Sequence, residues 1–552
     1  MSQLVNILNA FSERSKRGGY VFLFLVFFVI TFLIYLPAIH SKFVADFIDM
    51  VFYYEHHPAL TDFSKGILFD FVNRFVFKVW LQMFGYNVWA WHFLQCFLHA
   101  LNAVLFYALL DKILRQLKYR NYNAAALITT LCFLLSPYHT EPVLWGGDIN
   151  YLLVTCFIFM HLLTFVIFLQ SHKTKYLIVA AIALICGAFT HEWGWLSIPA
   201  DIVMVFILAP SLKQAFTKTN LKFGGIMAII MALYFANKLY SGNLVGHYGS
   251  DVHLRFHVKE ILPAFYRYLV KILLLGGSFP LPFLQKLYGF LDRTRGMLLL
   301  TAIIIAIVLL IVRGARQNSA LKAGIGFFLL FVMFIFPVLN LYFPYYIKID
   351  GDRYCYITSA FLLASVISTL YVIRPVLATV FSSVYLIASV CFLSYNIQNW
   401  RQAGNIAASL EKEFCWQNAP HVYILNLPDD YRGAYIYRSL NEPNLFTESF
   451  IKYGKPLPDA KKIIPVLGYN LNTPTDSVNV HIAGNDSLQV ELSTWGNWWW
   501  PQTNGTGYII DSLADVHVDS YNHTYAIKFK HKEPGDVFLY SANGHWRKVE
   551  GF

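Results

Sequence analysis

The sequence is poor in charged side chains. Only 14% of its 552 residues are Asp, Glu, Lys or Arg, whereas a soluble globular chain carries about 25%. The deficit is concentrated upstream of residue 396, where long apolar runs follow one another, and 57% of the whole chain is hydrophobic. This composition excludes an ordinary soluble globular protein and predicts a chain that lies largely in a membrane.

Cysteine pairs and phosphate-binding loops are also missing. The seven cysteines are scattered, mostly within apolar runs, and no two form a CxxC pair, so neither a disulfide framework nor a zinc site is indicated. No Walker-type or GxGxxG loop is present, so use of a nucleotide is not evident. Glu55-His56-His57 is not a metal motif, because adjacent histidines do not present two ligands on one helix face. The sequence therefore contains no motif for a metal or a resident cofactor. Whether the protein requires a divalent metal is left open by the sequence.

What the sequence has instead is a succession of apolar runs. A bilayer core is crossed by about 20 apolar residues of helix. The runs that reach or approach this length are 20–39, 89–110, 152–169, 176–190, 196–208, 224–240, 297–312, 324–341, 356–372 and 376–395, with 124–137 and 265–283 shorter or more broken. They predict a polytopic α-helical membrane protein with about 10–13 transmembrane helices.

The excess of positive charge, +11 in total, falls in short segments between these runs. Such segments are typical of cytoplasmic loops. The sequence has no basic stripe with interleaved aromatic residues, so binding to a nucleic acid is not indicated. The first run is too long for a signal peptide and lacks a cleavage site, so it is interpreted as a retained anchor. The basic residues 14–17 place the N-terminus in the cytoplasm, and with 265–283 as a re-entrant or half-span segment the C-terminal tail lies outside the cytoplasm.

The tail differs in texture from the rest of the chain. Short alternating segments separated by Gly, Asn, Asp and Pro predict strands at 421–427, 477–482, 487–492, 508–510, 525–529 and 537–539. We therefore predict a membrane module over 1–397 and an extracytoplasmic, strand-rich β or α/β domain over 398–552. Three Asn-x-Ser/Thr triplets in the tail are compatible with that location.

Polar residues collect at the span ends that this orientation places outside. Ionisable groups there are costly unless paired or hydrated, so they are functional candidates by default. The four groups, in chain order, contain Asp46, Asp49 and Glu55-His56-His57; His139, Glu141 and Asp148; His191 and Glu192; and Lys348, Asp350, Asp352, Arg353 and Tyr354. Four such groups on one side predict a shared cavity.

These residue types suit the transfer of a sugar from a lipid phosphate. An acceptor hydroxyl needs a carboxylate base, and the candidate is Asp46, just beyond the first span. The leaving phosphate needs cationic donors, and a guanidinium can hold it through two hydrogen bonds; the candidate is Arg353, assisted by His191 or Lys348. Two further residues, Glu141 and His139, are expected to position the acceptor or to orient the base. The supporting residues are Asp49, Asp148, Glu192, Asp352 and Tyr354.

Each assignment has a structural alternative of comparable weight. The alternatives are a helix N-cap for Asp46, a turn cap for His139 and Glu141, a structural pair for His191 and Glu192, and an interfacial anchor for Arg353. Three further histidines, His92, His99 and His161, lie within apolar runs and are predicted to pack between helices rather than to bind a ligand.

Together the loops resemble the GT-C superfamily of multi-span glycosyltransferases that use polyprenyl-phosphate sugars. Within it the chain looks most like the transmembrane and tetratricopeptide-repeat O-mannosyltransferases and their bacterial relatives. The matching segments, in the family's order, are Phe43-Val-Ala-Asp46, Pro137-Tyr-His139-Thr-Glu141-Pro-Val143 with Trp145, Thr190-His-Glu192-Trp-Gly194, and Asp352-Arg353-Tyr354-Cys-Tyr356.

The resemblance implies an outward-facing site, an inverting transfer, a first-loop aspartate as base and a lipid-phosphate donor. The chain also departs from the family pattern. Asp46 is followed by Phe47 instead of a second acid, His191 stands where a lysine is usual, and the expected Arg-x-Asp after His139-x-Glu141 is absent. Tetratricopeptide repeats do not follow the membrane part. These departures leave the sugar, the acceptor and any protein substrate undetermined.

The sequence therefore predicts an integral membrane glycosyltransferase of the cell envelope. It would move a hexose or pentose from a polyprenyl-phosphate donor to a hydroxyl of a lipid, glycan or protein acceptor on the non-cytoplasmic face. Two alternatives remain. A transporter or flippase of a lipid-linked sugar would carry charges deep in several spans or inverted repeats, and a catalytically degenerate scaffold would act through the tail.

Overall fold

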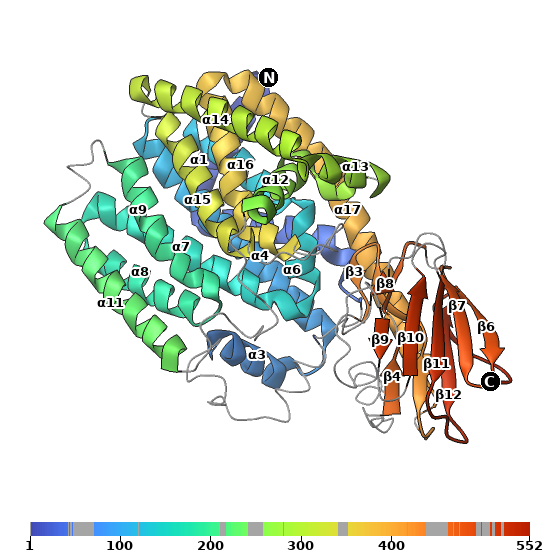
Figure 1. The fold of residues 1–552 in the computed structure, drawn as a ribbon. Coiled ribbons are helices and arrows are strands. Elements are labelled where there is room, and N and C mark those ends of the chain that lie inside the picture. The colour runs from blue at the N-terminus through green and yellow to red at the C-terminus, as the bar shows by residue number, and fades with distance from the viewer. Residues whose placement is uncertain are drawn as a thin grey trace. The chain divides into compact units, whose positions relative to one another are not determined.

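A computed structural model shows a helical part followed by a strand-rich part (Figure 1). It describes residues 2–41, 44, 47, 71–119, 121–209, 217–240, 258–279, 281–318, 320–339, 352–416, 418–437, 462–466, 468–473, 475–492, 498–499, 508–510, 514–519 and 524–552. The chain divides into two compact units, the first including Ala90–Ser394 and the second including Tyr395–Phe552.

The helical part, which includes the first unit and the end of the last helix in the second, is built from helices and short 3-10 turns. In its N-terminal half these are α1 (Ser2–Tyr35), η1 (Leu36–Ala38), α3 (Phe71–Phe84), α4 (Val88–Gln116), α5 (Tyr122–Leu134), η3 (Pro137–His139), α6 (Thr140–Leu144), η4 (Gly146–Asp148), α7 (Ile149–Ser171), α8 (Thr174–Ala188), η5 (Glu192–Leu196) and α9 (Ser197–Leu208). Then follow α11 (Lys218–Tyr240), α12 (Val258–Leu274), η7 (Gly276–Ser278), α13 (Leu281–Leu291), α14 (Thr294–Gln317), α15 (Leu321–Leu339), η8 (Asp352–Tyr354), α16 (Cys355–Ile373) and α17 (Pro375–Glu413).

Among the described residues, seven helical stretches are long and apolar enough to cross a membrane, and three more apolar helices are shorter. The seven begin at Gly19, Val88, Gly146, Thr294, Leu321, Asp352 and Pro375. They confirm the predicted class, a polytopic helical membrane protein with a strand-rich C-terminal region. The predicted half-span at 265–283 consists of the end of α12, the turn η7 and the start of α13.

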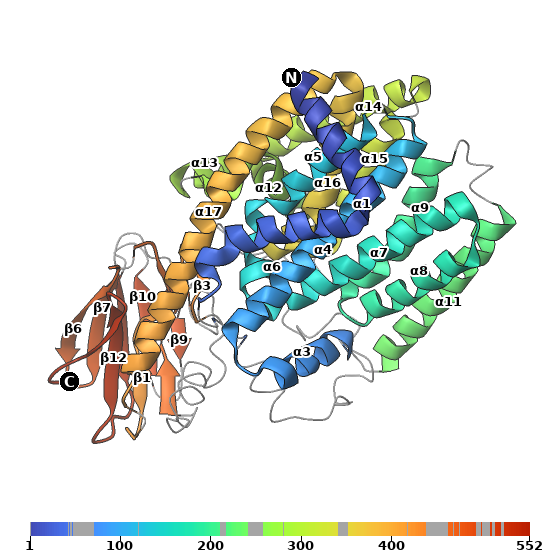
Figure 2. The same ribbon diagram turned by 180° about the vertical axis from the view of Figure 1, so that it is seen from behind.

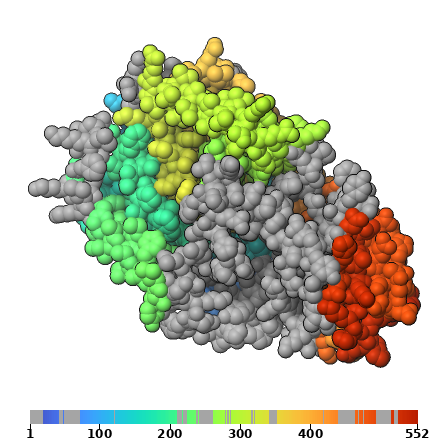
Figure 3. Space-filling model, viewed as in Figure 1, coloured from blue at the N-terminus to red at the C-terminus, as the bar shows by residue number. Residues whose placement is uncertain are grey.

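Burial separates central helices from peripheral ones. In α4 and α16, 78% of the most apolar window is buried inside the protein, and both helices lie at the centre of the helical part in two opposite views (Figures 1 and 2). In α14 only 11% is buried, and this helix lies at the surface in the space-filling view (Figure 3). Its exposed side chains include Leu298, Ile303 and Leu310. An apolar exposed face of this kind suits contact with lipid.

Close packing and hydrogen bonds hold the central helices together. A Cβ at Gly324 of α15 would lie 2.0 Å from the Thr369 hydroxyl of α16, so only glycine allows this approach. Beside it, the Ser365 hydroxyl donates to the Gly324 carbonyl at 2.7 Å. On the other side of α16, His99 Nδ1 and the Tyr356 hydroxyl are 2.7 Å apart. These contacts satisfy polar groups that would otherwise be buried without a partner.

The second unit contains three small sheets in its described part. The strands are β1 (Val422–Ile424), β2 (Leu427–Tyr431), β3 (Ala434–Tyr435), β4 (Ile463–Pro465), β5 (Gly468–Leu471), β6 (Val478–Gly484), β7 (Ser487–Leu492), β8 (Trp498–Trp499), β9 (Tyr508–Ile510), β10 (Ala514–Asp519), β11 (Thr524–Phe529), β12 (Val537–Ala542) and β13 (His545–Lys548). Their orders are β13-β12-β1-β4, β6-β7-β11-β10-β9 and β3-β2-β5-β8.

The five-stranded sheet is antiparallel throughout its described pairings. In β7 and β11 buried side chains alternate with exposed ones, which is typical of a sheet with one covered face. By contrast, β1 pairs in parallel with both β12 and β4. The second unit is therefore a mixed β structure, and the six strands predicted from the sequence all overlap observed ones.

Candidate functional site

The best-defined polar contact at the span ends joins Glu141 of α6 to Arg353 of η8. The Arg353 backbone N–H donates to Glu141 Oε2 at 2.7 Å, and its side-chain Nη1 donates to Glu141 Oε1 at 3.2 Å. The two side chains are only 2% and 12% exposed. One carboxylate thus fixes both the backbone and the guanidinium of Arg353, at the point where α16 begins.

Short local structure places Glu141. Pro137 begins η3, and Pro142 lies in the first turn of α6, where a missing N–H costs little. The carbonyls of Pro142 and Trp145 at the end of α6 both accept from Nε2 of Gln95, at 3.2 and 3.1 Å. Gln95 belongs to the central helix α4 and is 1% exposed. A five-residue helix is therefore held from the interior of the bundle.

Arg353 is surrounded by a second carboxylate and by aromatic rings. Asp148 Oδ1 lies 3.8 Å from Nη1 of Arg353. The guanidinium carbon is 5.3 Å from the ring centre of Trp145, 6.0 Å from that of Tyr151 and 5.1 Å from that of Tyr354. Cations are attracted to aromatic faces at these distances. These contacts hold the guanidinium in one orientation, and the carboxylates balance its charge.

A second buried ion pair lies beside the first. Asp352 of η8 forms an ion pair with Lys271 of α12, and both side chains are less than 10% exposed. Lys271 Nζ also lies 5.4 Å from the ring centre of Tyr138, and the Tyr138 hydroxyl accepts from the Gly277 N–H at 3.1 Å. Consecutive residues of η8 thus connect α6 and α12.

Lys271 was not predicted from the sequence. It lies in the run 265–283, where it follows three apolar or aromatic residues, 268–270, without any motif. The available signal was the lysine itself, because a lysine inside an apolar run requires a partner. Gln95 was missed for the same reason, since it stands within the run 89–110.

The two ion pairs and Asp148 form what we call the η8 cluster, made of Glu141, Asp148, Lys271, Asp352 and Arg353. With all five groups ionised, two positive and three negative charges leave a formal charge of −1. Both cations are therefore matched by carboxylates. Arg353 still has unused donors, because within the described part of the chain its buried Nε has no hydrogen-bond partner, and a guanidinium has five N–H groups.

His191 and Glu192 lie next to this cluster through a shared tyrosine. His191 Nδ1 accepts from the Trp193 N–H at 3.2 Å and so caps η5. Its ring centre is 4.7 Å from that of Tyr151, the same ring that faces Arg353. The nearest oxygen of Glu192 is 3.8 Å from His191 Nδ1. The structure thus brings the third predicted loop into contact with the fourth.

His139 has different neighbours. It is fully buried, its Nε2 is 3.1 Å from the Ser359 hydroxyl, and its ring packs on Phe133 and Tyr356 with centre distances of 4.6 and 4.5 Å. This burial, together with the nearby His99, lowers the pKa of His139 well below its usual value. The observed contacts are those of a packing residue, and the catalytic role predicted for His139 stays a prediction.

Three predicted site residues, Asp46, Asp49 and Lys348, lie outside the described residues. Two neighbours of Asp46 in sequence, Val44 and Phe47, are described and are 5% and 1% exposed.

Comparison with known proteins gives a structural similarity only. No protein-family model and no curated protein matches the sequence. The structure of ArnT from Cupriavidus metallidurans bound to undecaprenyl phosphate is 12% identical with a TM-score of 0.40, over 82% of this chain and 93% of that one. For ArnT in the apo state the identity is 12% and the TM-score 0.32, over 84% and 96%. ArnT belongs to the GT-C family, the family that the sequence motifs resemble.

Proposed function

We propose that this chain is a membrane glycosyltransferase that moves a sugar from a polyprenyl-phosphate donor to a hydroxyl of a lipid, glycan or protein acceptor. The observation that carries the proposal is the η8 cluster. Its members come from α6, η4, α12 and η8, so residues far apart in the sequence meet at the ends of apolar helices. Buried ionisable groups in such places are maintained at a cost and are typical of functional sites.

In this proposal Arg353 binds the donor phosphate. Glu141 holds the arginine in place through its backbone N–H and Nη1, and the aromatic rings limit its rotation. Among the described residues, Nη2 makes only a long contact of 3.5 Å, with the Tyr354 hydroxyl. The side of the guanidinium that carries Nη2 and Nε therefore retains donors for phosphate oxygens.

The formal charge of the η8 cluster determines which interactions could bind a phosphate there. A formal charge of −1 does not attract a phosphate by itself, so binding depends on directed hydrogen bonds and on further cationic groups. Lys348 and His191 are the candidates named from the sequence. His191 lies beside Tyr151. Because its Nδ1 accepts a hydrogen bond, the neutral imidazole carries its proton on Nε2, which is then a hydrogen-bond donor.

The base in this proposal is Asp46, and the active side is the non-cytoplasmic one. As the acceptor hydroxyl attacks the anomeric carbon, Asp46 takes its proton and the polyprenyl phosphate leaves with the bonding electron pair. The support for Asp46 is the sequence resemblance and its position after the first span. The support for the sidedness is the distribution of Lys and Arg between the spans.

A transporter is the second candidate, and one observation favours it. His161 of α7 and Asp201 of α9 are buried within the helices and are 3.0 Å apart. His161 Nδ1 also contacts the Ala180 carbonyl of α8 at 2.8 Å. Buried ionisable residues of this kind mark ion pathways in transporters. Here each has a partner, so the pair equally fits a clamp between three helices.

The proposal is tested with the purified full chain in lipid nanodiscs, a panel of labelled polyprenyl-phosphate sugars, and a membrane extract as acceptor. The expected result is label transfer that falls by about 10²–10⁴-fold in Asp46→Asn, the range for loss of a general base. The matched control is Asp292→Asn, an exposed carboxylate paired with Arg267, which should transfer like the wild type. Absence of transfer with every donor, by protein that remains folded, would favour the transporter or the scaffold.

A further inference from the structure

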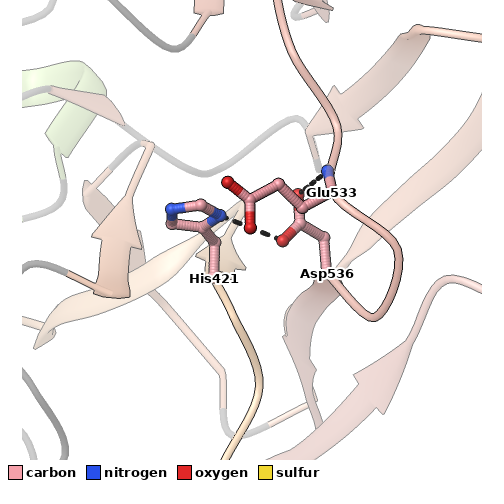
Figure 4. A group of neighbouring side chains, drawn as sticks. All are labelled: His421, Glu533 and Asp536. Atoms are coloured by element: carbon pink, nitrogen blue, oxygen red, sulfur yellow. Dashed lines mark hydrogen bonds and ion pairs between the residues drawn. The ribbon is translucent and has the colours of Figure 1, made fainter.

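A second group of chemically competent side chains lies in the C-terminal unit. His421 precedes β1, and Glu533 and Asp536 belong to the turn between β11 and β12. One ligand atom of each, an imidazole nitrogen or a carboxylate oxygen, lies within 4.8 Å of the other two. Figure 4 shows the Glu533 carboxylate turned toward the imidazole and toward Asp536. We call these residues the His421 group.

The register of the sheet brings the group together. β1 and β12 pair in parallel with Val422 opposite Val537, and the Val537 N–H donates to the His421 carbonyl at 2.9 Å. His421 and Asp536 each immediately precede these paired residues, so their side chains meet at the strand ends. The two positions are 115 residues apart in the sequence, which is why no short motif announces them.

The turn fixes the direction of Asp536. Its Oδ2 accepts from the Glu533 N–H at 2.8 Å, and its backbone N–H donates to the Glu533 carbonyl at 3.1 Å. Gly535 has a φ of +98°, and a Cβ there would approach Pro420 at 3.4 Å. Because Oδ2 is used within the turn, Oδ1 faces His421 Nδ1 at 3.0 Å. The side chain of Asp536 is 2% exposed.

The local charge is uncompensated by strong cations. Within the described part of the chain, no Lys or Arg forms an ion pair with Glu533 or Asp536. The adjacent Lys532 instead contacts the Asn485 carbonyl at 3.0 Å and the Phe552 ring at 3.5 Å. Two carboxylates so close to each other are unfavourable unless a cation lies between them. The hydrogen bonds of the His421–Asp536 pair and of the turn explain the positions of these two side chains. They do not explain why the Glu533 carboxylate lies beside them.

We propose that the His421 group binds a divalent cation of the zinc class. Zinc lies about 2.0–2.2 Å from nitrogen and oxygen ligands in a tetrahedral arrangement, so two of its ligand atoms are about 3.3–3.6 Å apart. His421 Nδ1 and Asp536 Oδ1 are hydrogen-bonded at 3.0 Å, so an ion would need to separate them by only a few tenths of an ångström. An imidazole with two carboxylates suits zinc or manganese, whereas calcium and magnesium prefer oxygen ligands alone. Water completes the coordination. The ion ties the β11–β12 turn to the start of β1.

The test uses the whole chain, purified in detergent, stripped of metal with a chelator and titrated with Zn²⁺ by calorimetry. The variants are Glu533→Gln and His421→Gln. The matched control is Glu491→Gln, which changes an exposed carboxylate on β7 of the same unit. The wild type and the control are expected to bind one more zinc ion than either variant, or to bind it at least about tenfold more tightly.

A stability readout separates metal binding from folding. Without metal, Glu533→Gln should unfold at or slightly above the temperature of the wild type, because its carboxylate is exposed and its loss removes the repulsion from Asp536. Added Zn²⁺ should raise the unfolding temperature of the wild type and not that of the variant. Equal zinc stoichiometry and affinity in all four proteins would overturn the proposal. So would a site that binds Ca²⁺ and is lost in Glu533→Gln but kept in His421→Gln, since that result would exclude the imidazole as a ligand.

Discussion

At the scale of single residues, Glu141 does more than neutralise Arg353. It accepts from the arginine's backbone as well as from its side chain, so it sets where η8 lies and where the guanidinium points. An interfacial anchor, the alternative considered for Arg353, would keep its head in water. The observed side chain is 12% exposed and contacts a carboxylate that is 2% exposed. The buried pair therefore fits a positioned site better than an anchor.

Glu141→Gln is expected to weaken this positioning without unfolding the protein. The amide oxygen can still accept from the Arg353 backbone, but the charged partner of the guanidinium is lost, which costs about 1.5–3 kcal/mol. We expect a lower unfolding temperature in detergent and a donor KM that rises more than kcat falls. Asp292→Asn removes an exposed partner of Arg267 and should cost less than about 1 kcal/mol. Equal effects of the two changes would contradict the positioning role.

His139 gives the chain a dependence of stability on pH. Its folded-state pKa lies well below its usual value because of burial, so the unfolded chain binds more protons than the folded chain below about pH 6.5. Above that pH the buried neutral histidine costs no stability. Below it, the free energy of unfolding decreases by at most about 1.4 kcal/mol per pH unit. Unfolding measured between pH 7.5 and 5 should show a smaller decrease for His139→Gln than for the wild type. An unchanged decrease would assign the pH dependence to other groups.

At the scale of elements, long apolar runs were predictable and short elements were not. The runs at 89–110, 152–169 and 356–372 fall within α4, α7 and α16, because about 20 apolar residues leave few other structures. Strand β2 was missed: its sequence, Leu-Pro-Asp-Asp-Tyr, argues against a strand, and the pairing with β5 overrides that preference.

The same limit applies to the candidate site. The sequence placed Glu141, Asp148, Asp352 and Arg353 in functional loops, and the structure joins them. The sequence showed a lysine at position 271 inside an apolar run but not its partner, because Asp352 is 81 residues away in the chain and becomes adjacent only after α12 folds against η8. Motifs identify residues that share a loop. They do not identify a side chain supplied by another helix.

The third loop depends on one close backbone approach between elements. A Cβ at Gly194 of η5 would lie 2.1 Å from the carbonyl carbon of Gly187 in α8. Gly194→Ala is therefore expected to push η5 away from α8 and to move His191 from the Tyr151 ring. We expect a loss of stability of about 3 kcal/mol, the upper end of the range typical of overpacking, and a loss of transfer activity.

The control for this substitution is Gly225→Ala in α11, where nothing lies within 4 Å of the added Cβ. A helical glycine replaced by alanine without a clash changes stability by about 0.4–1 kcal/mol in the favourable direction. Unfolding temperatures of the two variants provide the comparison. If Gly194→Ala were as stable and active as Gly225→Ala, η5 would not require this contact.

At the scale of the whole molecule, the two units have different physical characters. The first exposes apolar side chains along helices such as α14, and the second has sheets with alternating buried and exposed residues. The predicted boundary at 397/398 falls inside α17, and the second compact unit includes Tyr395–Phe552. The orientation of both ends of the chain stays a prediction from the positions of Lys and Arg.

The proposed transfer from a polyprenyl phosphate depends most on Arg353. The most direct measurement compares initial rates of transfer from one labelled donor by the wild type, Arg353→Gln and Arg115→Gln. Arg115 is a matched control, since it lies at the end of α4 and pairs with Asp111 at 3.1 Å. We predict a decrease of about 10²-fold or more for Arg353→Gln, as for loss of a directed hydrogen-bond donor, and little change for Arg115→Gln. Transfer at the wild-type rate by folded Arg353→Gln would show that Arg353 does not bind the donor phosphate.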